Sequence, residues 1–348
     1  MDRRSFLTWS LMGGLTAPAR ALYGKSGGLA TRGVVLTPSD LSLEDWPERA
    51  ARAKLTTVAL HESALAVISK FVLSEAGRRF LAGCRRLSLD VEYELHIMSD
   101  LLERRHFDSD PDLFRMDETG LRQRDWNLCV SSERALSLVA ENAVAIARIL
   151  KPTTNRYFFW GDDNRGWCRC PRCKGLSDSD QALIVENRIV RELRKTNAKA
   201  SLAHLSYRGT LQPPTQVKPE DGVFMEFAPI ERTFALRLRP LTDRRHRARK
   251  DVPSNGELMD LLDANLAVFP SSSAQILEYW LDASAFSRWT RPARQLPWDR
   301  DVLAADVAQY RQRGIPHITS FAVFLDAEYL RRYGEPPLSE YGAVLNSA

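Results

Sequence analysis

Residues 157–175 contain the densest group of chemically useful side chains in the sequence. The apolar and aromatic run at 157–160 is typical of a buried strand. Asp162 and Asp163 follow it directly, in a segment whose glycines indicate a loop. Acidic residues at the C-terminal end of a buried strand are the usual place for catalysis in an α/β enzyme. We therefore favour a catalytic function for these two aspartates over the alternative, a turn beside a structural cysteine cluster.

Paired carboxyl groups suggest glycoside hydrolysis, in which one group protonates the leaving oxygen and the other acts as nucleophile or base. Asp163 is the favoured general acid because it lies further along the loop, and Asp162 is expected to orient it or to bind a hydroxyl. Glu226 and Glu278, on later strands, are the candidate catalytic partners. For each of these glutamates, an internal salt bridge in the fold is an equally good interpretation.

Several cysteines beside this loop suggest a second site. Cys168, Cys170 and Cys173 follow the aspartates with the spacing Cys-x-Cys-x-x-Cys, and Cys129 precedes the helix that leads into the same strand. Four thiolates can hold one structural Zn2+ and leave no open position for water. Two disulfides are the alternative, and they are natural in an oxidising compartment. Zinc is slightly favoured, no cofactor is expected for catalysis, and Cys84 is expected to be a buried free thiol.

The elements that position these residues alternate between short apolar strands and amphipathic helices. Strands are expected at 33–37, 56–60, 90–98, 156–160, 200–207, 223–228, 274–281 and 317–324. Helices are expected at 43–54, 64–87, 131–150, 177–196, 255–269 and 299–313. This order predicts an α/β protein that is a (β/α)8 TIM barrel in a single domain. A doubly wound open sheet is the second choice, because no glycine-rich phosphate loop follows any strand.

A barrel brings the C-terminal ends of its strands to one mouth. The side chains expected there to bind substrate are His61, Glu62, Glu94, His96, Trp160, Trp167, His204, Tyr207, Arg208, Tyr279, Trp280 and Asp282. The aromatic members can stack on sugar faces, and the polar members can bind hydroxyl groups. A single strand histidine such as His204 is more often a satisfied core residue, so this expectation depends on the grouping of many such side chains.

The N-terminus resembles a twin-arginine export signal. Arg3 and Arg4 precede an apolar stretch at 6–17, and Ala-Arg-Ala at 19–21 fits a cleavage site. Residues 1–21 are therefore expected to be a signal peptide, 22–32 a flexible lead-in, and 33–348 the barrel domain. A periplasmic or secreted location follows, and this route exports folded proteins, so that a metal could be loaded first. The alternative is a frayed N-terminus of a cytoplasmic protein.

Composition limits the partners that this chain can have. The 348 residues are 44% hydrophobic and 27% charged with a net charge of +5, which is typical of a soluble globular protein and only mildly basic. No nucleic-acid motif and no run long enough to span a bilayer is present. The expected partner is an oligo- or polysaccharide, because the carboxyl and aromatic side chains suit a sugar. The arginine-rich segment 232–250 raises the hypothesis of an acidic sugar, although a solvated basic loop is favoured. The oligomeric state stays open.

A set of motifs supports a resemblance to a known family. They are Cys129 in a Leu-Cys-x-Ser-Ser segment, Asp162-Asp163, the Trp-Cys-x-Cys-Pro-x-Cys sequence at 167–173, Asn187, Tyr207, Glu278-Tyr279-Trp280 and Tyr329. Together they resemble a large bacterial family of uncharacterised TIM-barrel proteins, catalogued as a domain of unknown function and related to α-glucuronidases and hexosaminidases. The resemblance covers roughly residues 55–335. It implies a barrel glycosidase with its acid near the fourth strand, where Asp163 replaces the glutamate of an Asp-Glu pair.

Three functions follow from these patterns. The first is an exported glycoside hydrolase that acts on a glycan, with uronic-acid and amino-sugar glycosides as candidate substrates. The second is a non-catalytic carbohydrate-binding barrel, which needs the same aromatic side chains. The third is a metal-dependent hydrolase that uses His61, Glu94 and His96, although the sequence lacks the His-Glu-x-x-His spacing of such enzymes. The sugar, its linkage and the stereochemical course stay open.

Overall fold

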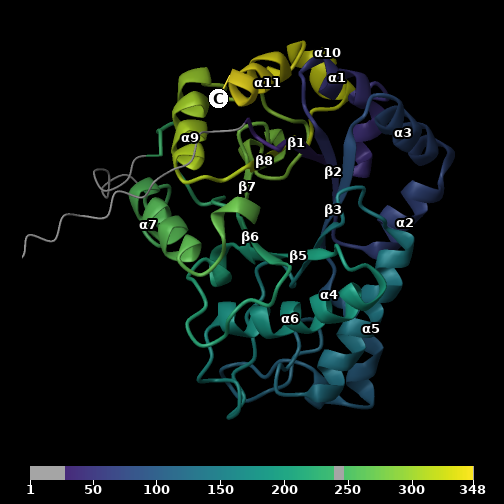
Figure 1. Cartoon of the computed structure of the whole chain (residues 1–348), viewed down its shortest axis with the longest axis vertical. Coiled ribbons are helices and arrows are strands. Elements are labelled where there is room, and N and C mark those ends of the chain that lie inside the picture. The colour runs from purple at the N-terminus through teal and green to yellow at the C-terminus, as the bar shows by residue number, and fades with distance from the viewer. Residues whose placement is uncertain (1–27, 239–246, 348) are drawn as a thin grey trace, which may run out of the picture.

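Eight parallel strands pair in chain order and close into a barrel, because the last strand pairs with the first (Figure 1). The structure is a computed structural model that describes residues 28–238 and 247–347. The strands are β1 (Thr31–Leu36), β2 (Thr57–Glu62), β3 (Asp90–His96), β4 (Arg156–Trp160), β5 (Ser201–Ser206), β6 (Val223–Phe227), β7 (Gln275–Glu278) and β8 (His317–Phe321). The (β/α)8 barrel predicted from the sequence is thus confirmed, and each expected strand is present.

Helices surround the barrel as a layer on its outer side (Figure 1). They are α1 (Trp46–Arg52), α2 (Leu65–Leu73), α3 (Glu75–Arg86), α4 (Met98–Leu101), α5 (Glu133–Ile149), α6 (Asp178–Thr196), α7 (Asn255–Leu266), α8 (Ala283–Phe286), α9 (Arg300–Gln312), α10 (Ala327–Tyr333) and α11 (Leu338–Ser347). Short 3-10 helices lie at Pro38–Ser42, Arg104–Asp108, Pro111–Leu113, Arg208–Thr210 and Ser271–Ser273. None of the helices in the described ranges is long and apolar enough to cross a membrane.

Two differences from the expected elements have local causes. The helix expected at 64–87 is divided into α2 and α3, because Ser74 is extended and its hydroxyl accepts a hydrogen bond from the Gly77 amide at 3.0 Å. A serine in this position is a strong helix N-cap and so starts a new helix. β7 ends at Glu278, three residues earlier than expected, and the chain then turns into α8.

The hydrophobic core has two parts, because successive strand residues point to opposite sides of the barrel wall. The larger part lies between strands and helices and contains Val58, Leu60 and Trp280. The smaller part fills the barrel interior and contains Trp160 and Tyr279. The neighbours Tyr279 and Trp280 therefore belong to different parts of the core, and this alternation decides which predicted residues can reach the mouth.

A buried polar network lies within the barrel. Arg156 donates to Oε1 of Gln275 at 2.7 Å, and Nε2 of Gln275 donates to Oε1 of Glu226 at 2.9 Å. Glu94 lies 3.4 Å from the same amide nitrogen. Burial raises the pKa of Glu226 to about 8, and burial together with the Glu226 charge raises the pKa of Glu94 well above its ordinary value. Neutral glutamates at pH 7 explain how several carboxyl groups share one arginine.

Candidate active site

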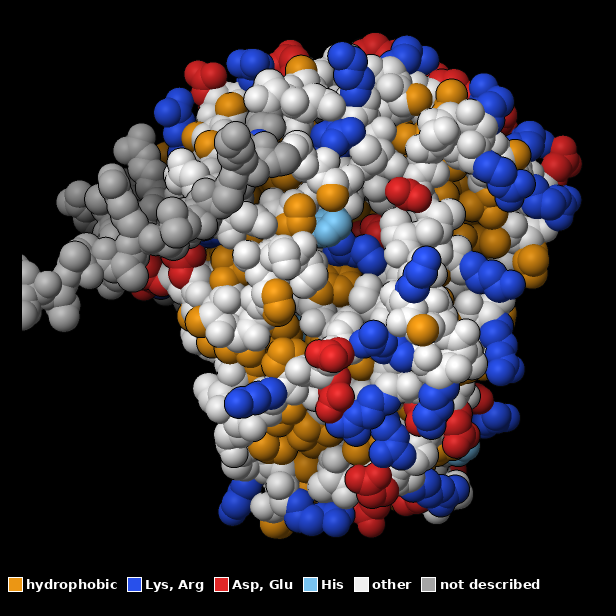
Figure 2. Space-filling view, in the orientation of Figure 1, with side chains coloured by type: hydrophobic (Ala, Val, Ile, Leu, Met, Phe, Trp, Pro, Cys, Tyr) orange, Lys and Arg blue, Asp and Glu red, His pale blue; other side chains and the backbone are white. Residues whose placement is uncertain are grey.

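A cavity of about 480 Å³ lies at the C-terminal ends of the strands. It is lined by Thr37, His61, Ser63, His96, Trp160, Asp163, Leu205, Tyr207, Arg208, Ile230, Leu277, Tyr279, Asp282, Ser284, Trp289, Phe321 and Val323. We call it the mouth cavity. A smaller cavity of about 180 Å³ adjoins it, sharing Asp163 and Tyr207 and adding Asp162 and Trp167. Figure 2 shows a hollow near the centre of this face in which a histidine lies among hydrophobic side chains.

Asp162 and Asp163 point into different surroundings. Asp162 is half-buried and accepts a hydrogen bond from Nη2 of Arg104 at 2.5 Å, and burial nevertheless raises its pKa. Asp163 is exposed and lines the mouth cavity together with Tyr207. Burial and the nearby Asp163 charge raise the pKa of Tyr207, so the phenol stays protonated. Only Asp163 of the pair is free to meet a substrate.

Asn127 holds the loop that carries these aspartates. Its Oδ1 accepts a hydrogen bond from the Asp162 amide at 2.8 Å, and its Nδ2 donates to the Arg165 carbonyl at 3.1 Å. The side chain is 1% exposed, so these contacts are protected from water. A buried amide that satisfies both sides of a loop fixes its path. Asn127 could not be predicted from the sequence, because its partners are backbone groups of a distant segment.

His61 and His96 form part of the cavity wall as neutral side chains. Nδ1 of His61 donates to the Glu94 carbonyl at 2.8 Å, and Nδ1 of His96 donates to the Gly161 carbonyl at 2.7 Å. A carbonyl oxygen only accepts, so each Nδ1 carries the proton and each Nε2 is left as an acceptor. Burial lowers the pKa of His61 to about 4 and also lowers the pKa of His96. Both can accept a hydrogen bond from a substrate hydroxyl.

Asp282 is the second carboxyl group that lines the mouth cavity. Its Oδ1 accepts hydrogen bonds from the Ser284 amide, the Ser284 hydroxyl and the Ala285 amide at 3.0, 2.6 and 3.2 Å. The residue is 4% exposed, and burial raises its pKa to about 6 in spite of these hydrogen bonds. Oδ2 has no hydrogen-bond partner in the described part of the chain and is the oxygen on which a proton would reside.

Aromatic side chains form the rest of the cavity surface. The Tyr279 and Phe321 rings stack with centroids 5.3 Å apart, and the Trp160 ring lies 4.9 Å from that of His96. Trp289 lies at the edge of the cavity and is 61% exposed, which is unusual for such a large apolar side chain. Trp289 and Phe321 were not among the predicted site residues, because a tryptophan in a connection and a core phenylalanine have no distinctive sequence pattern.

Two of the predicted site residues lie outside the barrel, on the helix side. Glu278 is fully buried and accepts hydrogen bonds from Nη1 of Arg232 at 2.7 Å and from the hydroxyl of Tyr310 at 2.5 Å. Nε1 of Trp280 donates to Oδ2 of Asp306 at 3.2 Å in the same cluster. The structure thus corrects the placement of both side chains at the mouth, because Tyr279 between them occupies the inward position. The internal salt bridge weighed for Glu278 is what the structure shows.

Several other predicted site residues also do not line the mouth cavity. His204 faces the helices, where its Nδ1 lies 2.6 Å from Oε2 of Glu186 and its ring stacks on Phe269. Glu226 is fully buried, and its Oε2 accepts a hydrogen bond from Nε1 of Trp160 at 3.0 Å. Glu62 accepts a hydrogen bond from the Ser63 amide. The residues that do not line the mouth cavity are therefore Glu62, Glu94, Asp162, Trp167, His204, Glu226, Glu278 and Trp280.

The arginines of segment 232–250 that the structure describes form ion pairs within the protein. Arg232 is buried against Glu278, Arg247 pairs with Glu257, and Arg249 lies 3.2 Å from Asp251. The basic side chain that does line the mouth cavity is Arg208, in a left-handed backbone conformation with φ of 44°. Such backbone strain in a non-glycine residue is often found at functional sites. Arg239, Arg244 and Arg245 lie outside the described residues.

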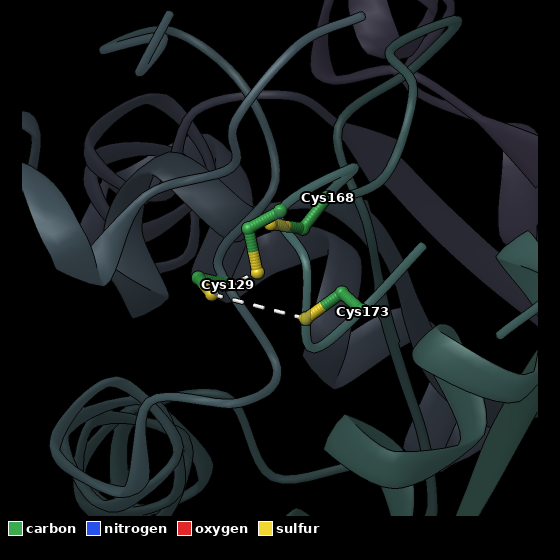
Figure 3. A group of neighbouring side chains, drawn as sticks. Cys129, Cys168 and Cys173 are labelled. Carbon is green, nitrogen blue, oxygen red and sulfur yellow. Dashed lines mark hydrogen bonds between the residues drawn. The ribbon is translucent and has the colours of Figure 1, made fainter. Parts of the chain in front are cut away.

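Cys129, Cys168, Cys170 and Cys173, which we call the cysteine cluster, lie together behind the smaller cavity. The sulfur atoms of all four lie within 4.8 Å of one another, and Figure 3 shows Cys129, Cys168 and Cys173 side by side. In the described ranges, this is the only group of three or more histidine, cysteine or acidic side chains close enough to hold a metal ion. His61, Glu94 and His96 do not form such a group, which argues against the metal-dependent hydrolase considered from the sequence.

Comparison with known sequences assigns the chain to a family. Residues 72–255 match the family described as "Domain of unknown function (DUF4838)". The chain belongs to the DUF4838 family. The matched segment of this DUF4838 protein contains both aspartates of the β4 loop and the cysteine cluster. No curated protein sequence matches the chain.

Solved structures with a similar fold are glycoside hydrolases. A β-N-acetylhexosaminidase from Bacteroides fragilis matches with a TM-score of 0.54 at 12% identity, over 91% of this chain and 66% of that chain. A β-galactosidase from Marinomonas has a TM-score of 0.46 at 12% identity, over 90% and 58% of the two chains. A β-amylase catalytic domain from Paenibacillus polymyxa has a TM-score of 0.49 at 10% identity, over 92% of this chain and 99% of that chain. The DUF4838 chain thus spans less than two thirds of the first two proteins. At 12% identity, the similarity to the hexosaminidase shows the barrel fold alone.

Proposed function

We propose that this DUF4838 protein is a glycoside hydrolase whose active site is the mouth cavity. The observation that carries the proposal is the pair of carboxyl groups in one aromatic cavity: Asp163 after β4 and Asp282 after β7. Glycosidic bond cleavage needs two carboxyl groups beside the bond, and aromatic surfaces with a few polar groups are what sugar rings require. The similarity of the fold to a β-N-acetylhexosaminidase is consistent with this chemistry.

The surroundings of the two carboxyl groups suggest different functions for them. Asp282 has a raised pKa of about 6 and is protonated in mildly acidic solution, so it suits the general acid. Asp163 is exposed in the cavity beside Tyr207 and suits the nucleophile or base. The sequence suggested Asp163 as the acid, because it lies further along the loop, and suggested Asp282 only as a substrate-binding residue. The structure supports the revised assignment through the difference in burial.

We expect kcat/KM to fall as the pH rises above about 6, with a slope approaching one decade per pH unit. The reason is the sign of the Asp282 pKa shift: burial favours the protonated acid up to about pH 6, and above it the proton that the leaving oxygen needs is lost. The pH dependence of kcat/KM for an aryl glycoside checks this. A falling limb that stays unchanged in Asp282→Asn would show that another group is the acid.

The substrate that we propose is a glycan, with a uronic-acid or amino-sugar residue at the cleavage site. Nε2 of His61 and Nε2 of His96 are available to sugar hydroxyls. Arg208 lines the cavity and contacts Glu231 through Nε at 3.1 Å, which leaves its terminal nitrogens for a carboxylate. An arginine fork matches a carboxylate in geometry and charge. We also propose export by the twin-arginine route, on the basis of the sequence of residues 1–21. These residues lie outside the described part of the structure.

Trp289→Ala is expected to raise KM by about 5- to 10-fold and to change kcat little, since about 1 kcal/mol of stacking is lost in both ground and transition states. Trp289 is chosen because it is exposed at the cavity edge. Steady-state kinetics on an oligosaccharide substrate measures both constants. Leu73→Ala is the control, because Leu73 is also exposed and apolar but lies at the end of α2, outside the cavity. An unchanged KM in the tryptophan variant would remove Trp289 from the binding surface.

A panel of aryl glycosides tests the proposed function against the carbohydrate-binding alternative. Glucuronides, galacturonides, N-acetylglucosaminides and neutral hexosides are incubated with the protein, and aglycone release is followed by absorbance. Turnover of one class supports the hydrolase and names the sugar. Binding of an oligosaccharide by calorimetry without turnover of any glycoside would favour the non-catalytic barrel instead.

A further inference from the structure

We propose that the cysteine cluster binds one structural Zn2+, which fastens the connection between β3 and α5 to the loop that carries Asp163. Cys129 comes from the first of these segments, and Cys168, Cys170 and Cys173 come from the second. This inference goes beyond the proposed hydrolase function and does not depend on it. It rests on the positions and surroundings of four sulfur atoms.

The distances between the sulfur atoms match a tetrahedral zinc site. Sγ of Cys129 lies 3.8 Å from Sγ of Cys170 and 3.9 Å from Sγ of Cys173, and all four sulfurs lie within 4.8 Å. A zinc–sulfur bond of about 2.3 Å places tetrahedral ligands about 3.8 Å apart. A disulfide needs about 2.05 Å between two sulfurs. The four atoms form one compact group in place of two close pairs, and the cysteines are free thiols.

The surroundings of the cluster supply hydrogen bonds and a positive charge. The Met116 amide donates to Sγ of Cys168 at 3.3 Å, and the Ser131 hydroxyl lies 3.1 Å from Sγ of Cys129. Nη1 of Arg122 lies 3.8 Å from Sγ of Cys168. Thiolates bound to zinc carry excess negative charge, and donors around them stabilise that charge. The cysteines themselves are 0–3% exposed, so water cannot supply these donors.

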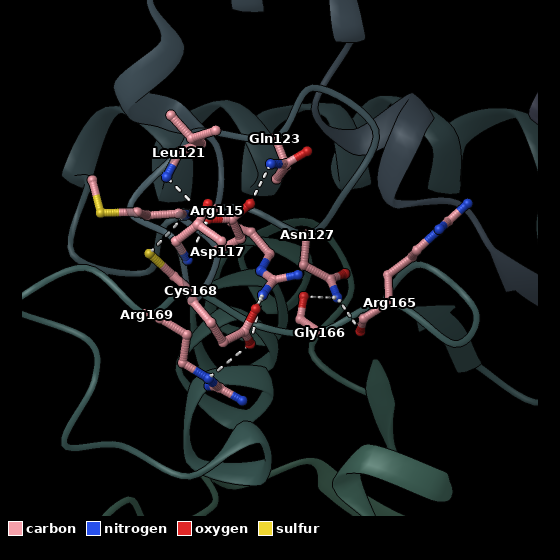
Figure 4. Close-up of polar contacts among 12 residues, drawn as sticks. Arg115, Asp117, Leu121, Gln123, Asn127, Arg165, Gly166, Cys168 and Arg169 are labelled. Atoms are coloured by element: carbon pink, nitrogen blue, oxygen red, sulfur yellow. Dashed lines mark hydrogen bonds and ion pairs between the residues drawn. The ribbon is translucent and has the colours of Figure 1, made fainter.

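The other contacts between the two segments are made by single side chains and one backbone pair, and they include the ion pair between Arg104 and Asp162. The Arg169 amide donates to the Met116 carbonyl at 2.8 Å, and Asn127 bonds to the Asp162 amide and to the carbonyls of Arg165 and Gly166 (Figure 4). No regular strand or long helix is present in either segment near these contacts. A metal that joins four side chains across irregular segments contributes folding free energy directly. The zinc is therefore expected to hold the loop of Asp163 in place without touching substrate.

Elemental analysis of the purified full chain tests metal binding directly. We expect about one zinc per chain in the wild type and in Cys84→Ser, the control, because Cys84 is a buried cysteine of α3 outside the cluster. Cys170→Ser is expected to lose at least about 90% of its zinc, and Arg122→Gln to bind zinc about 10-fold more weakly. Zinc retained equally in Cys170→Ser, or wild-type protein without zinc and with these cysteines in disulfides, would overturn the proposal.

A second measurement covers the case in which Cys170→Ser does not fold. Wild-type protein reconstituted with Co2+ should show the strong visible absorption of a tetrahedral thiolate site, and its absence overturns the proposal.

Hydrogen exchange before and after zinc removal tests whether the metal holds the two segments together. Exchange at the Cys168 and Arg169 amides should become at least about 10-fold faster, while amides of β1 stay protected. Equal exchange rates would contradict a structural role. These readouts use no substrate, so they hold whether or not the hydrolase proposal fails.

Discussion

Asp163→Asn is expected to lower kcat by about 100-fold or more, the usual scale for the loss of a catalytic carboxyl group. The replacement keeps the size of the side chain, so the cavity that Asp163 lines should keep its shape. What is lost is the negative charge that lines the mouth cavity beside the neutral His61 and His96. Steady-state kinetics on the glycoside found with the panel measures the change.

The matched control for this variant is Asp125→Asn. Asp125 is an exposed aspartate that lines neither the mouth cavity nor the smaller cavity next to it. It should keep wild-type kcat, whereas both Asp163→Asn and Asp282→Asn should lose most activity and keep substrate binding. Activity of Asp163→Asn within about threefold of the wild type would exclude this residue from the chemical step.

Arg232→Met is expected to lower the free energy of unfolding by about 3–5 kcal/mol, because it leaves buried charges without a partner. Arg232 bonds to Glu278 and to Asp306, each at 2.7 Å, and the three side chains are fully excluded from solvent at these contacts. Urea unfolding followed by circular dichroism measures the loss. The triple variant Arg232→Met, Glu278→Gln, Asp306→Asn should recover part of the stability, since the charges are then removed together.

The control for the arginine replacement is Arg247→Met. Arg247 forms an ion pair with Glu257, but both side chains are about one third exposed. An ion pair in contact with water contributes little, so a loss of less than about 1 kcal/mol is expected. If both variants lost the same free energy of unfolding, burial would not explain the contribution of the Arg232 ion pairs to stability.

The barrel could be predicted from the sequence because its signal is local. Each strand is a short apolar run and each helix has its own apolar periodicity, so eight alternating segments suffice to predict the closed parallel sheet that the structure confirms. Several boundaries were less accurate, since β7 and β8 each end three residues before the expected position. The helix break at Ser74 was missed, although a serine before Glu75 is a recognisable N-cap signal.

The phase of the strands explains most errors in the predicted site. Neighbouring residues of a strand face opposite sides of the sheet, but this alternation does not reveal which member of a buried pair faces inward. Tyr279 and Leu205 face the interior, so Glu278, Trp280 and His204 face the helices. In strands that are apolar on both faces, composition cannot resolve this choice. β3, by contrast, alternates strictly, and its polar residues Glu92, Glu94 and His96 share the inner side as expected.

Loop residues were the least predictable part of the site. Asn127 and Trp289 act through contacts between segments far apart in the chain, which no local pattern reveals. The cysteines were recognisable by their types and spacing, and the structure brings all four together. Asp282 was recognised as a mouth residue, but its raised pKa depends on burial by surrounding elements and could only come from the structure.

The most direct test of the proposed active site is product analysis by mass spectrometry after incubation with an oligosaccharide panel in H2(18)O. If the mouth cavity hydrolyses a glycosidic bond, wild-type protein should release a shorter saccharide, and Asp163→Asn should release almost none. The product should contain one oxygen-18 atom at its new reducing end, because water attacks the anomeric carbon in such reactions. Recovery of every saccharide intact from the wild type, while one of them is bound, would contradict the hydrolase and leave a carbohydrate-binding barrel.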